Sequence, residues 1–324
     1  MRKISAFAHI NIALIKYWGK SDLKNNIPTT PSLSLTVNKF GTKTSLSESN
    51  SNSDYLTINN IKQSGLSLKR VIDFINIFRN LTGIKKHLTI NSFNNMPIAS
   101  GMASSASGFA SLAVACNKYF NLNLNKQKLS KLARLGSGSA ARSIFGNFVA
   151  LNGGINIDNK ECIAKNVKYS KLLHLNMLIV ICSNNKKDIL SRSGMNYSYK
   201  TSPFFSKFIE INCKLFKQAL NALELGCFKK LGEAMEQSTL NMHATCLSSN
   251  PGFWYFNSTT IKILNKIKQL RKKNYKCYFT MDAGPHVKIL CYQNDAFKLK
   301  KELEKINGII SINILKQGQA AYLL

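Results

Sequence analysis

Hydrophobic residues recur along the chain at two periods, and each period predicts a different kind of element. Residues 3–9 follow the pattern of a β-strand. Polar, turn-forming residues at 21–31 are followed by strict alternation over 33–37, which predicts a second strand. Apolar residues spaced three and four apart over 68–81 predict an amphipathic helix. The first part of the chain is therefore expected to combine strands with helices.

A continuous apolar run of strand length at 175–183 follows the polar stretch 156–169. We therefore expect a lobe boundary near residue 170, which divides the chain into residues 1–170 and 171–324. Because regular βαβ alternation is lacking, we predict an α+β fold. Beyond the boundary the pattern predicts helices at 205–225, 228–241 and 259–272, strands at 276–281 and 287–292, and then one more helix and strand.

The composition is that of a chain with a large buried core. Of 324 residues, 44% are hydrophobic and 10% aromatic, and no apolar run approaches the roughly 18 residues that span a bilayer. Arg2 and Lys3 precede apolar residues as in a signal peptide, but Ser5, His9 and Asn11 interrupt the apolar region. The eight cysteines contain no C-x-x-C pair and are typical of reduced core residues. We expect a cytoplasmic protein that is not embedded in a membrane.

A formal net charge of +30 leaves two kinds of anionic partner open, nucleic acid and negatively charged small molecules. Seven of the 45 basic residues are Arg and 38 are Lys, in a chain also rich in Asn and Ile, as an AT-biased genome produces. The lysines are scattered along helical patterns such as 262–276 and 298–305, which favours solvated helix faces over a stripe that follows a phosphate backbone. We expect no specific nucleic-acid partner, while weak binding that falls steeply with salt stays open.

A run of small residues, Pro97-Ile-Ala-Ser-Gly-Met-Ala-Ser-Ser-Ala106, leads into a helix expected to begin near Ser104 or Ser105. Small residues let a phosphate approach the backbone, and helix N-terminal amides favour an anion. The hydroxyls of Ser104 and Ser105 can add donors or a magnesium ligand. The alternative is a serine cap before an alanine-rich packed helix, and the run by itself leaves both open.

Two familiar nucleotide-binding motifs are rejected by their context. Gly19-Lys-Ser21 resembles the end of a P-loop, but Leu14 stands where the first glycine is required. Gly136-Ser-Gly-Ser-Ala-Ala141 fits a loose dinucleotide fingerprint, yet it follows a helical pattern over 129–133 and not a strand. Neither P-loop nor Rossmann binding is expected.

Five stretches stand out in order along the chain: Ala8-His-Ile-Asn-Ile-Ala-Leu-Ile-Lys-Tyr-Trp-Gly-Lys20, the Pro97–Ala106 loop, Gly136-Ser-Gly-Ser-Ala-Ala-Arg-Ser143, Lys186-Lys-Asp-Ile-Leu-Ser-Arg-Ser-Gly-Met195 and Met281-Asp-Ala-Gly-Pro285. Together they resemble segments of mevalonate diphosphate decarboxylases, a family of the GHMP small-molecule kinase superfamily. Three departures from that family occur: Met102 stands where Leu is usual, Asn147 where Gly is common, and His286 where Asn is frequent. None removes a reactive group, although His286 bears on active-site access or pH response.

The resemblance implies a GHMP-kinase-like fold of two lobes, the first like ribosomal protein S5 and the second ferredoxin-like, with the active site in the cleft between them. It implies that ATP, with Mg²⁺, phosphorylates the tertiary hydroxyl of mevalonate 5-diphosphate. Loss of that phosphate with carbon dioxide then gives isopentenyl diphosphate, in the mevalonate pathway of isoprenoid biosynthesis. A homodimer is implied by the family alone. A mevalonate monophosphate decarboxylase or a related small-molecule kinase remains the alternative.

The resemblance also assigns roles to three charged residues. Asp282, at the end of an apolar strand, is expected to orient or deprotonate the hydroxyl, although an Asp before Gly-Pro also simply starts a turn. Lys16 is expected to supply a fixed positive charge beside it; without the resemblance it is one surface lysine among many. Arg142 is expected to hold the substrate carboxylate with its two-pronged donor group, the alternative being a salt bridge at a helix start. His243 is left open between a structural and a functional role.

The remaining expected site residues bind phosphate groups. Ser137 and Ser139 are expected to add donors near the substrate or the γ-phosphate of ATP, with helix capping as the alternative. The substrate diphosphate is expected to be held by Tyr17, Lys20, Ser191 and Arg192, and the ATP phosphates by Pro97, Ser100, Gly101, Met102, Ala103, Ser104 and Ser105, the last two also as possible magnesium ligands.

Overall fold

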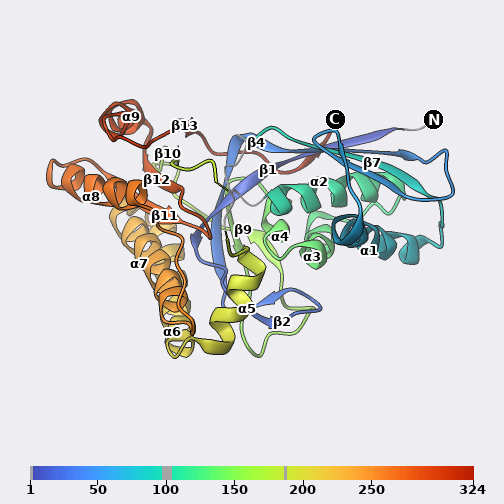
Figure 1. Cartoon of the computed structure of the whole chain (residues 1–324), viewed down its shortest axis with the longest axis horizontal. Coiled ribbons are helices and arrows are strands. Elements are labelled where there is room, and N and C mark those ends of the chain that lie inside the picture. The colour runs from blue at the N-terminus through green and yellow to red at the C-terminus, as the bar shows by residue number, and fades with distance from the viewer. Residues whose placement is uncertain (1–2, 97–103, 186–187) are drawn as a thin grey trace.

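The computed structural model describes residues 3–96, 104–185 and 188–324. Figure 1 shows an elongated molecule in which two main sheets lie side by side, each with its own helices. The predicted α+β class and the two-lobe arrangement are confirmed. Within the described ranges, no helix has the length and apolar character needed to cross a membrane. Five expected phosphate-loop residues lie outside the described part: Pro97, Ser100, Gly101, Met102 and Ala103.

The first sheet is built on two long antiparallel strands, β1 (Ile4–Ile15) and β4 (Ser32–Glu48). The register of β1 against β4 shifts between His9 and Asn11 and again between Ala13 and Ile15. The other strands are β5 (Tyr55–Ile58), β6 (Ile61–Lys62), β7 (Leu88–Asn94), β8 (Phe148–Leu151), β9 (Ala164–Asn166) and β14 (Tyr322–Leu323), in the order β14-β1-β4-β7-β5-β6 with β8 on β4 and β9 on β8.

Helices cover one face of this sheet, as Figure 1 shows. Phe74 and Phe109 meet edge to face, 5.1 Å between ring centroids, within the core that the helices bury against the sheet. The helix predicted over 68–81 is confirmed, and Gly83, with φ of 74°, ends it in the left-handed conformation that glycine favours. The helices are α1 (Gly65–Thr82), α2 (Ser104–Tyr119), α3 (Lys126–Gly136) and α4 (Ala140–Ser143).

The second sheet has the strand order β11-β12-β10-β13, and all of its neighbours are antiparallel. This is the order of a ferredoxin-like sheet. One face packs on α8 and α9, and the other on α6 and α7. The elements are α6 (Phe205–Glu224), α7 (Phe228–Leu247), α8 (Ser258–Lys272), α9 (Ala296–Glu304), β10 (Leu175–Ile181), β11 (Cys277–Met281), β12 (Val287–Tyr292) and β13 (Ser311–Leu315), which confirm the predicted helices and strands apart from shifts at their ends.

The two lobes share an apolar core, in which Leu14 and Leu35 of the first sheet join Met177 and Leu290 of the second. Below this junction in the view of Figure 1 lie elements that the sequence pattern did not predict, namely α5 (Ser191–Thr201) and a hairpin of β2 (Lys20–Asp22) and β3 (Ile27–Pro28) within the expected turn. We propose the lobe division near residue 170, between β9 and β10, with the short β14 returning to pair with β1.

Candidate active site

A cavity of about 500 Å³ opens between the lobes, and its lining is polar and basic. Among the described residues, five cationic side chains and a single acidic one, Asp282, line it, and six serines add hydroxyl groups. Such a lining suits a ligand that carries several negative charges. The cations are Lys16, Lys20, Arg70, Arg142 and Arg192, and the serines are Ser104, Ser105, Ser137, Ser139, Ser191 and Ser193.

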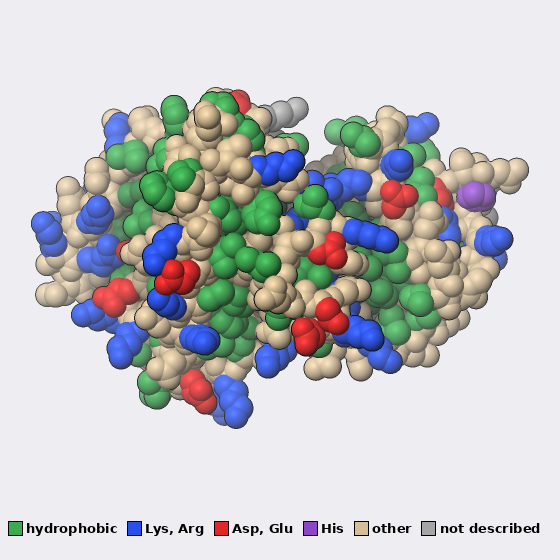
Figure 2. All heavy atoms as spheres, turned by 90° about the horizontal axis from the view of Figure 1, so that it is seen from below, with side chains coloured by type: hydrophobic (Ala, Val, Ile, Leu, Met, Phe, Trp, Pro, Cys, Tyr) green, Lys and Arg blue, Asp and Glu red, His purple; other side chains and the backbone are tan. Residues whose placement is uncertain are grey.

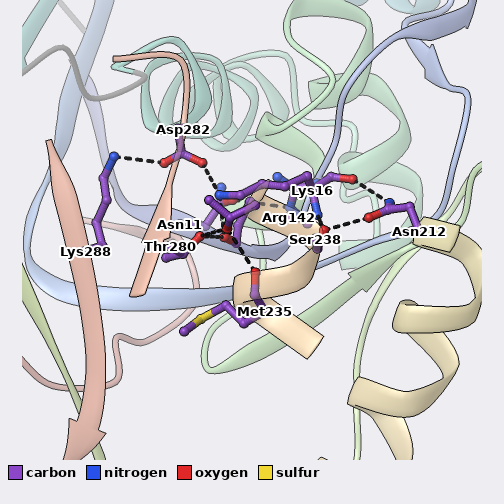
Figure 3. A network of polar contacts seen from close by, with 11 residues as sticks. Asn11, Lys16, Arg142, Asn212, Met235, Ser238, Thr280, Asp282 and Lys288 are labelled. Atoms are coloured by element: carbon purple, nitrogen blue, oxygen red, sulfur yellow. Dashed lines mark hydrogen bonds and ion pairs between the residues drawn. The ribbon is translucent and has the colours of Figure 1, made fainter. Parts of the chain in front are cut away.

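Asp282 stands directly after β11, between two lysines that come from different lobes (Figure 3). Lys16 Nζ donates to its Oδ1 at 2.8 Å, and Lys288 Nζ lies 3.1 Å from its Oδ2. The lysine side chains are 1% and 4% exposed, whereas that of Asp282 is 41% exposed. Two buried ammonium groups therefore share one carboxylate, which reaches the cavity.

This charge pattern fixes the ionisation state of the carboxylate. Enclosure by the protein raises the pKa of Asp282, but the ammonium groups of Lys16 and Lys288 outweigh it and hold the pKa well below its usual range. Burial lowers the pKa of Lys16 to about 8, against the opposing pull of Asp282. At neutral pH the site thus holds an ionised carboxylate of low basicity beside the charged Lys16.

Lys16 follows the last residue of β1 and is anchored by α6 and α7. Its N–H donates to Ser238 Oγ at 2.9 Å, and its carbonyl accepts a hydrogen bond from Asn212 Nδ2 at 3.0 Å. Ser238 Oγ in turn donates to Asn212 Oδ1 at 2.6 Å, and both residues are fully buried. The Lys16 ammonium also donates to the Ala13 carbonyl at 3.0 Å. These bonds fix the Lys16 ammonium beside the Asp282 carboxylate. Lys16 is therefore not a surface lysine.

Arg142 projects from α4, and its hydrogen-bond partners are neutral. Its Nη1 donates to Ser32 Oγ at 2.6 Å and its Nε to Asn11 Oδ1 at 3.2 Å, while the guanidinium carbon lies 5.9 Å from the Tyr17 ring centroid. Asn11 Nδ2 donates to Ser143 Oγ. This hydrogen bond orients the Asn11 amide so that its Oδ1 points toward the guanidinium. No ion pair to Arg142 occurs among the described residues. The alternative of a helix-start salt bridge is therefore wrong, and the charge is left for an anionic ligand.

Tyr17 and Lys20 form a second polar group, held by Asn26. Lys20 Nζ donates to Asn26 Oδ1 at 2.6 Å, and the Tyr17 hydroxyl donates to the Asn26 carbonyl at 3.1 Å. Gly138 packs closely on this group, because a Cβ there would lie 2.2 Å from the Tyr17 hydroxyl oxygen. Glycine is therefore needed at 138 to let the tyrosine lie beside the cavity.

Serine hydroxyls continue along the cavity wall. Ser105 Oγ lies 3.3 Å from Ser137 Oγ, which lies 3.4 Å from Ser139 Oγ. Ser139 precedes α4 but makes no side-chain capping bond to it, so the capping alternative is wrong for this residue. Ser191 and Arg192 open α5 and also line the cavity. The cavity brings together every described residue expected at the site from the sequence.

Sequence reasoning missed Lys288, Arg70 and Asn11. The sequence does contain a feature that could have identified Lys288, because it is the only charged residue in the apolar strand β12. Arg70 lies on α1, where a polar residue indicates only a solvated helix face, yet it lines the cavity and donates to the Gly136 carbonyl at 3.3 Å. In the sequence Asn11 only interrupts the apolar region at the start of the chain, whereas in the structure it supports Arg142.

Two histidines lie behind the cavity. His243 is 1% exposed and its ring packs 4.7 Å from that of Phe256; burial, with a smaller effect of Lys16, lowers its pKa to about 3. It does not line the cavity, which favours the structural role. His286 Nδ1 accepts a hydrogen bond from the Cys182 N–H at 3.3 Å, tying the turn after Asp282 to the end of β10.

The two-lobe architecture and its basic central cavity define an enzyme with a GHMP-kinase-like fold. Residues 8–164 match the family model of the diphosphomevalonate decarboxylase-like N-terminal domain, and residues 177–317 that of the mevalonate 5-diphosphate decarboxylase C-terminal domain. The chain therefore belongs to the diphosphomevalonate decarboxylase family.

Individual relatives agree with this placement. The chain is 35% identical to the diphosphomevalonate decarboxylase of Debaryomyces hansenii over 94% of its own length and 84% of that protein, and 32% identical to that of Saccharomyces cerevisiae over 94% and 82%. The mevalonate diphosphate decarboxylase structure from Staphylococcus aureus superposes with a TM-score of 0.94 at 35% identity, covering 100% of this chain and 98% of that one. A structure of the protein abbreviated MDDEF, in complex with MVAPP, AMPPCP and magnesium, superposes with a TM-score of 0.93 at 37% identity over 99% and 98%.

Proposed function

We propose that this protein converts mevalonate 5-diphosphate and ATP into isopentenyl diphosphate, ADP, phosphate and carbon dioxide. The observation that carries the proposal is the Asp282 carboxylate, which lysines fix at the cavity, while no ion pair to the other cavity cations occurs in the described part of the chain. The cavity thus offers one group to orient a hydroxyl, a separate Arg142 for a carboxylate, and a separate basic group around Lys20 for a diphosphate. These are the functional groups of mevalonate 5-diphosphate.

In the first step Asp282 orients the tertiary hydroxyl toward the γ-phosphorus of ATP. A bond forms from the hydroxyl oxygen to phosphorus as the bond to the ADP oxygen breaks. Because the pKa of Asp282 is held so low, we expect the proton to reach the carboxylate after most of the phosphoryl transfer, as a loose transition state allows. The charge of Lys16 stabilises the transferred group.

In the second step the new phosphate departs with the electron pair of its carbon–oxygen bond. The bond to the substrate carboxylate then breaks, its electrons form the alkene, and carbon dioxide leaves. Arg142 has the geometry to hold that carboxylate, since a guanidinium offers two parallel donors. Asn11 and Ser32 fix its orientation, so the breaking carbon–carbon bond is held in line with the departing phosphate.

The phosphate groups are assigned to two sets of cavity residues. Tyr17, Lys20, Ser191 and Arg192 are proposed to hold the substrate diphosphate. The first residues of α2, with Ser137 and Ser139, are proposed to bind the ATP phosphates together with the preceding loop, since amides at a helix start favour anions. Mg²⁺ prefers oxygen ligands, and the hydroxyls of Ser104 and Ser105 with phosphate oxygens fit it. When bound, Mg²⁺ neutralises charge on the phosphate groups.

Binding of the diphosphate is expected to weaken as the pH rises through about 8. Burial, followed by the charges of Arg192 and Arg70, lowers the pKa of Lys20 to about 8, so its charge is lost above that pH. KM for the substrate should rise by up to about tenfold per pH unit between pH 8 and 10. Lys20→Met should raise KM at pH 7 and flatten this dependence, whereas Lys24→Met, at an exposed lysine of the same hairpin, should change neither. A Lys20→Met enzyme that keeps the full pH dependence would contradict the assignment.

The nearest alternatives act on related substrates. A monophosphate decarboxylase would lack the need for a diphosphate site, and a kinase would release ADP without carbon dioxide. We expect mevalonate 5-diphosphate to be turned over with at least about a hundredfold higher kcat/KM than the monophosphate, because several charged hydrogen bonds are lost with one phosphate group. Steady-state assays with both substrates measure this ratio, and equal turnover would contradict the diphosphate assignment.

Three further proposals concern the setting of the enzyme. We propose a cytoplasmic homodimer, and a monomer in sedimentation at micromolar concentration would contradict the dimer. Figure 2 shows lysines and arginines spread over the visible face and interleaved with acidic and neutral side chains. This spread supports the proposal that no specific nucleic acid is bound. Tight RNA or DNA binding at physiological salt would overturn it.

A further inference from the structure

Lys288 occupies a place where an apolar residue is expected. It lies in β12, an inner strand of the second sheet, opposite Thr280 of β11 and Ile179 of β10. Leu290, two residues on and therefore on the same face, belongs to the apolar core between the lobes. Lys288 is 3% exposed, and burying an ammonium costs several kcal/mol unless it is compensated. Its presence calls for a role that an apolar side chain cannot fill.

The contact of Lys288 points to Asp282. Its Nζ lies 3.1 Å from Asp282 Oδ2, and Figure 3 shows it reaching the carboxylate from the side opposite Lys16. Lys288 is not among the residues that line the cavity. Its direct contact with a cavity residue is the one with Asp282, so we argue its effect on a bound substrate through that carboxylate.

Pairing of Asp282 does not require a second lysine. Lys16 alone gives the carboxylate a buried partner at 2.8 Å, so the second ammonium adds a desolvation cost to a charge that is already paired. The second ammonium instead fixes the orientation of the carboxylate. Each Asp282 oxygen now has its own ammonium, so rotation of the carboxylate breaks a contact. A carboxylate that is 41% exposed at the start of a turn would otherwise be free to turn.

We propose that Lys288 is a positioning residue for the reaction, which holds Oδ2 of Asp282 so that the carboxylate keeps one orientation toward the substrate hydroxyl. This inference rests on the proposed function of Asp282. Other titratable groups that act on the pair surround it from the end of β1, from α4, from α7 and from the end of β10. They are Lys16, Arg142, His243 and Cys182.

Lys288→Met tests the proposal, because methionine fills similar space without charge and suits the apolar face. We expect kcat to fall roughly 10- to 100-fold, as for a misplaced catalytic group. KM for ATP and for mevalonate 5-diphosphate should change by less than about twofold. The midpoint of thermal unfolding should not fall. The acid limb of the kcat–pH profile should move to higher pH, because one of the two charges that lower the pKa of Asp282 is gone. Lys229→Met, at an exposed lysine, is the control and should match the wild type.

Two results would overturn the proposal. The first is a variant whose kcat and pH profile superimpose on those of the wild type. The second is a lower unfolding midpoint with normal kcat per folded enzyme, because Lys288 would then be purely structural. Lys288→Gln is measured in the same way, so that a folding failure of the methionine variant leaves the question answerable. The wild-type enzyme is assayed in parallel for carbon dioxide. Absence of wild-type product would refute the proposed function, whereas a normal wild type beside an unaltered variant refutes only the role of Lys288.

Discussion

Asp282→Asn is expected to lower kcat roughly a thousandfold or more while ATP and mevalonate 5-diphosphate still bind. The amide keeps the size of the carboxylate but accepts no proton and cannot compensate both Lys16 and Lys288. Because the change removes negative charge from a cavity that binds anions, substrate affinity should be unchanged or higher. Single-turnover ADP release gives the rate, and equilibrium titration gives the two dissociation constants.

The matched control for this variant is Asp73→Asn, at an exposed carboxylate on α1. It removes the same charge from the first lobe without touching the cavity and should keep wild-type turnover. An Asp282→Asn enzyme with near-normal kcat would exclude Asp282 as the essential carboxylate. Loss of substrate binding together with turnover would instead indicate that the substitution disturbs the cavity as a whole.

Arg142→Ala is expected to damage binding and rate together, with a loss of roughly a hundredfold or more in kcat/KM. The guanidinium is 2% exposed and hydrogen-bonded only to neutral side chains among the described residues, so its charge is available to the substrate carboxylate. Without it the carboxylate binds less tightly and is not aligned for departure. KM for mevalonate 5-diphosphate should rise and kcat should fall, whereas KM for ATP should change little.

Two companion substitutions sharpen the test of Arg142. Arg142→Lys keeps the charge but loses the two-pronged geometry, and it should recover only part of the rate. Arg271→Lys is the control, at an arginine paired with Glu236 outside the cavity, and should leave the kinetics unchanged. Full activity in Arg142→Lys would contradict the proposal that the two-pronged guanidinium aligns the carboxylate. Only the positive charge at residue 142 would then have a role.

Much of the fold could be predicted from hydrophobic periodicity because most helices bury one continuous stripe. The exceptions have local causes. The strand expected at 3–9 is shorter than β1, which continues through a register shift between His9 and Asn11 to Ile15. The helix expected at 228–241 continues to Leu247 because buried polar residues, His243 among them, continue its inner face.

The candidate site was predicted through resemblance and not from the chemistry of single residues. Asp282, Lys16 and Arg142 are separated by more than a hundred positions, and only the closing of the two lobes brings them to one cavity. Residues that act through others escaped prediction, because nothing in the sequence shows that Asn11 supports Arg142 or that Lys288 reaches Asp282. Supporting contacts of this kind are set by tertiary packing.

The most direct test of the proposed reaction is release of labelled carbon dioxide from carboxyl-labelled mevalonate 5-diphosphate, measured with magnesium, with and without ATP, alongside ADP formation. We predict ATP-dependent release with one carbon dioxide for each ADP. ADP without carbon dioxide would identify a kinase and contradict the decarboxylase assignment, as would the absence of both products.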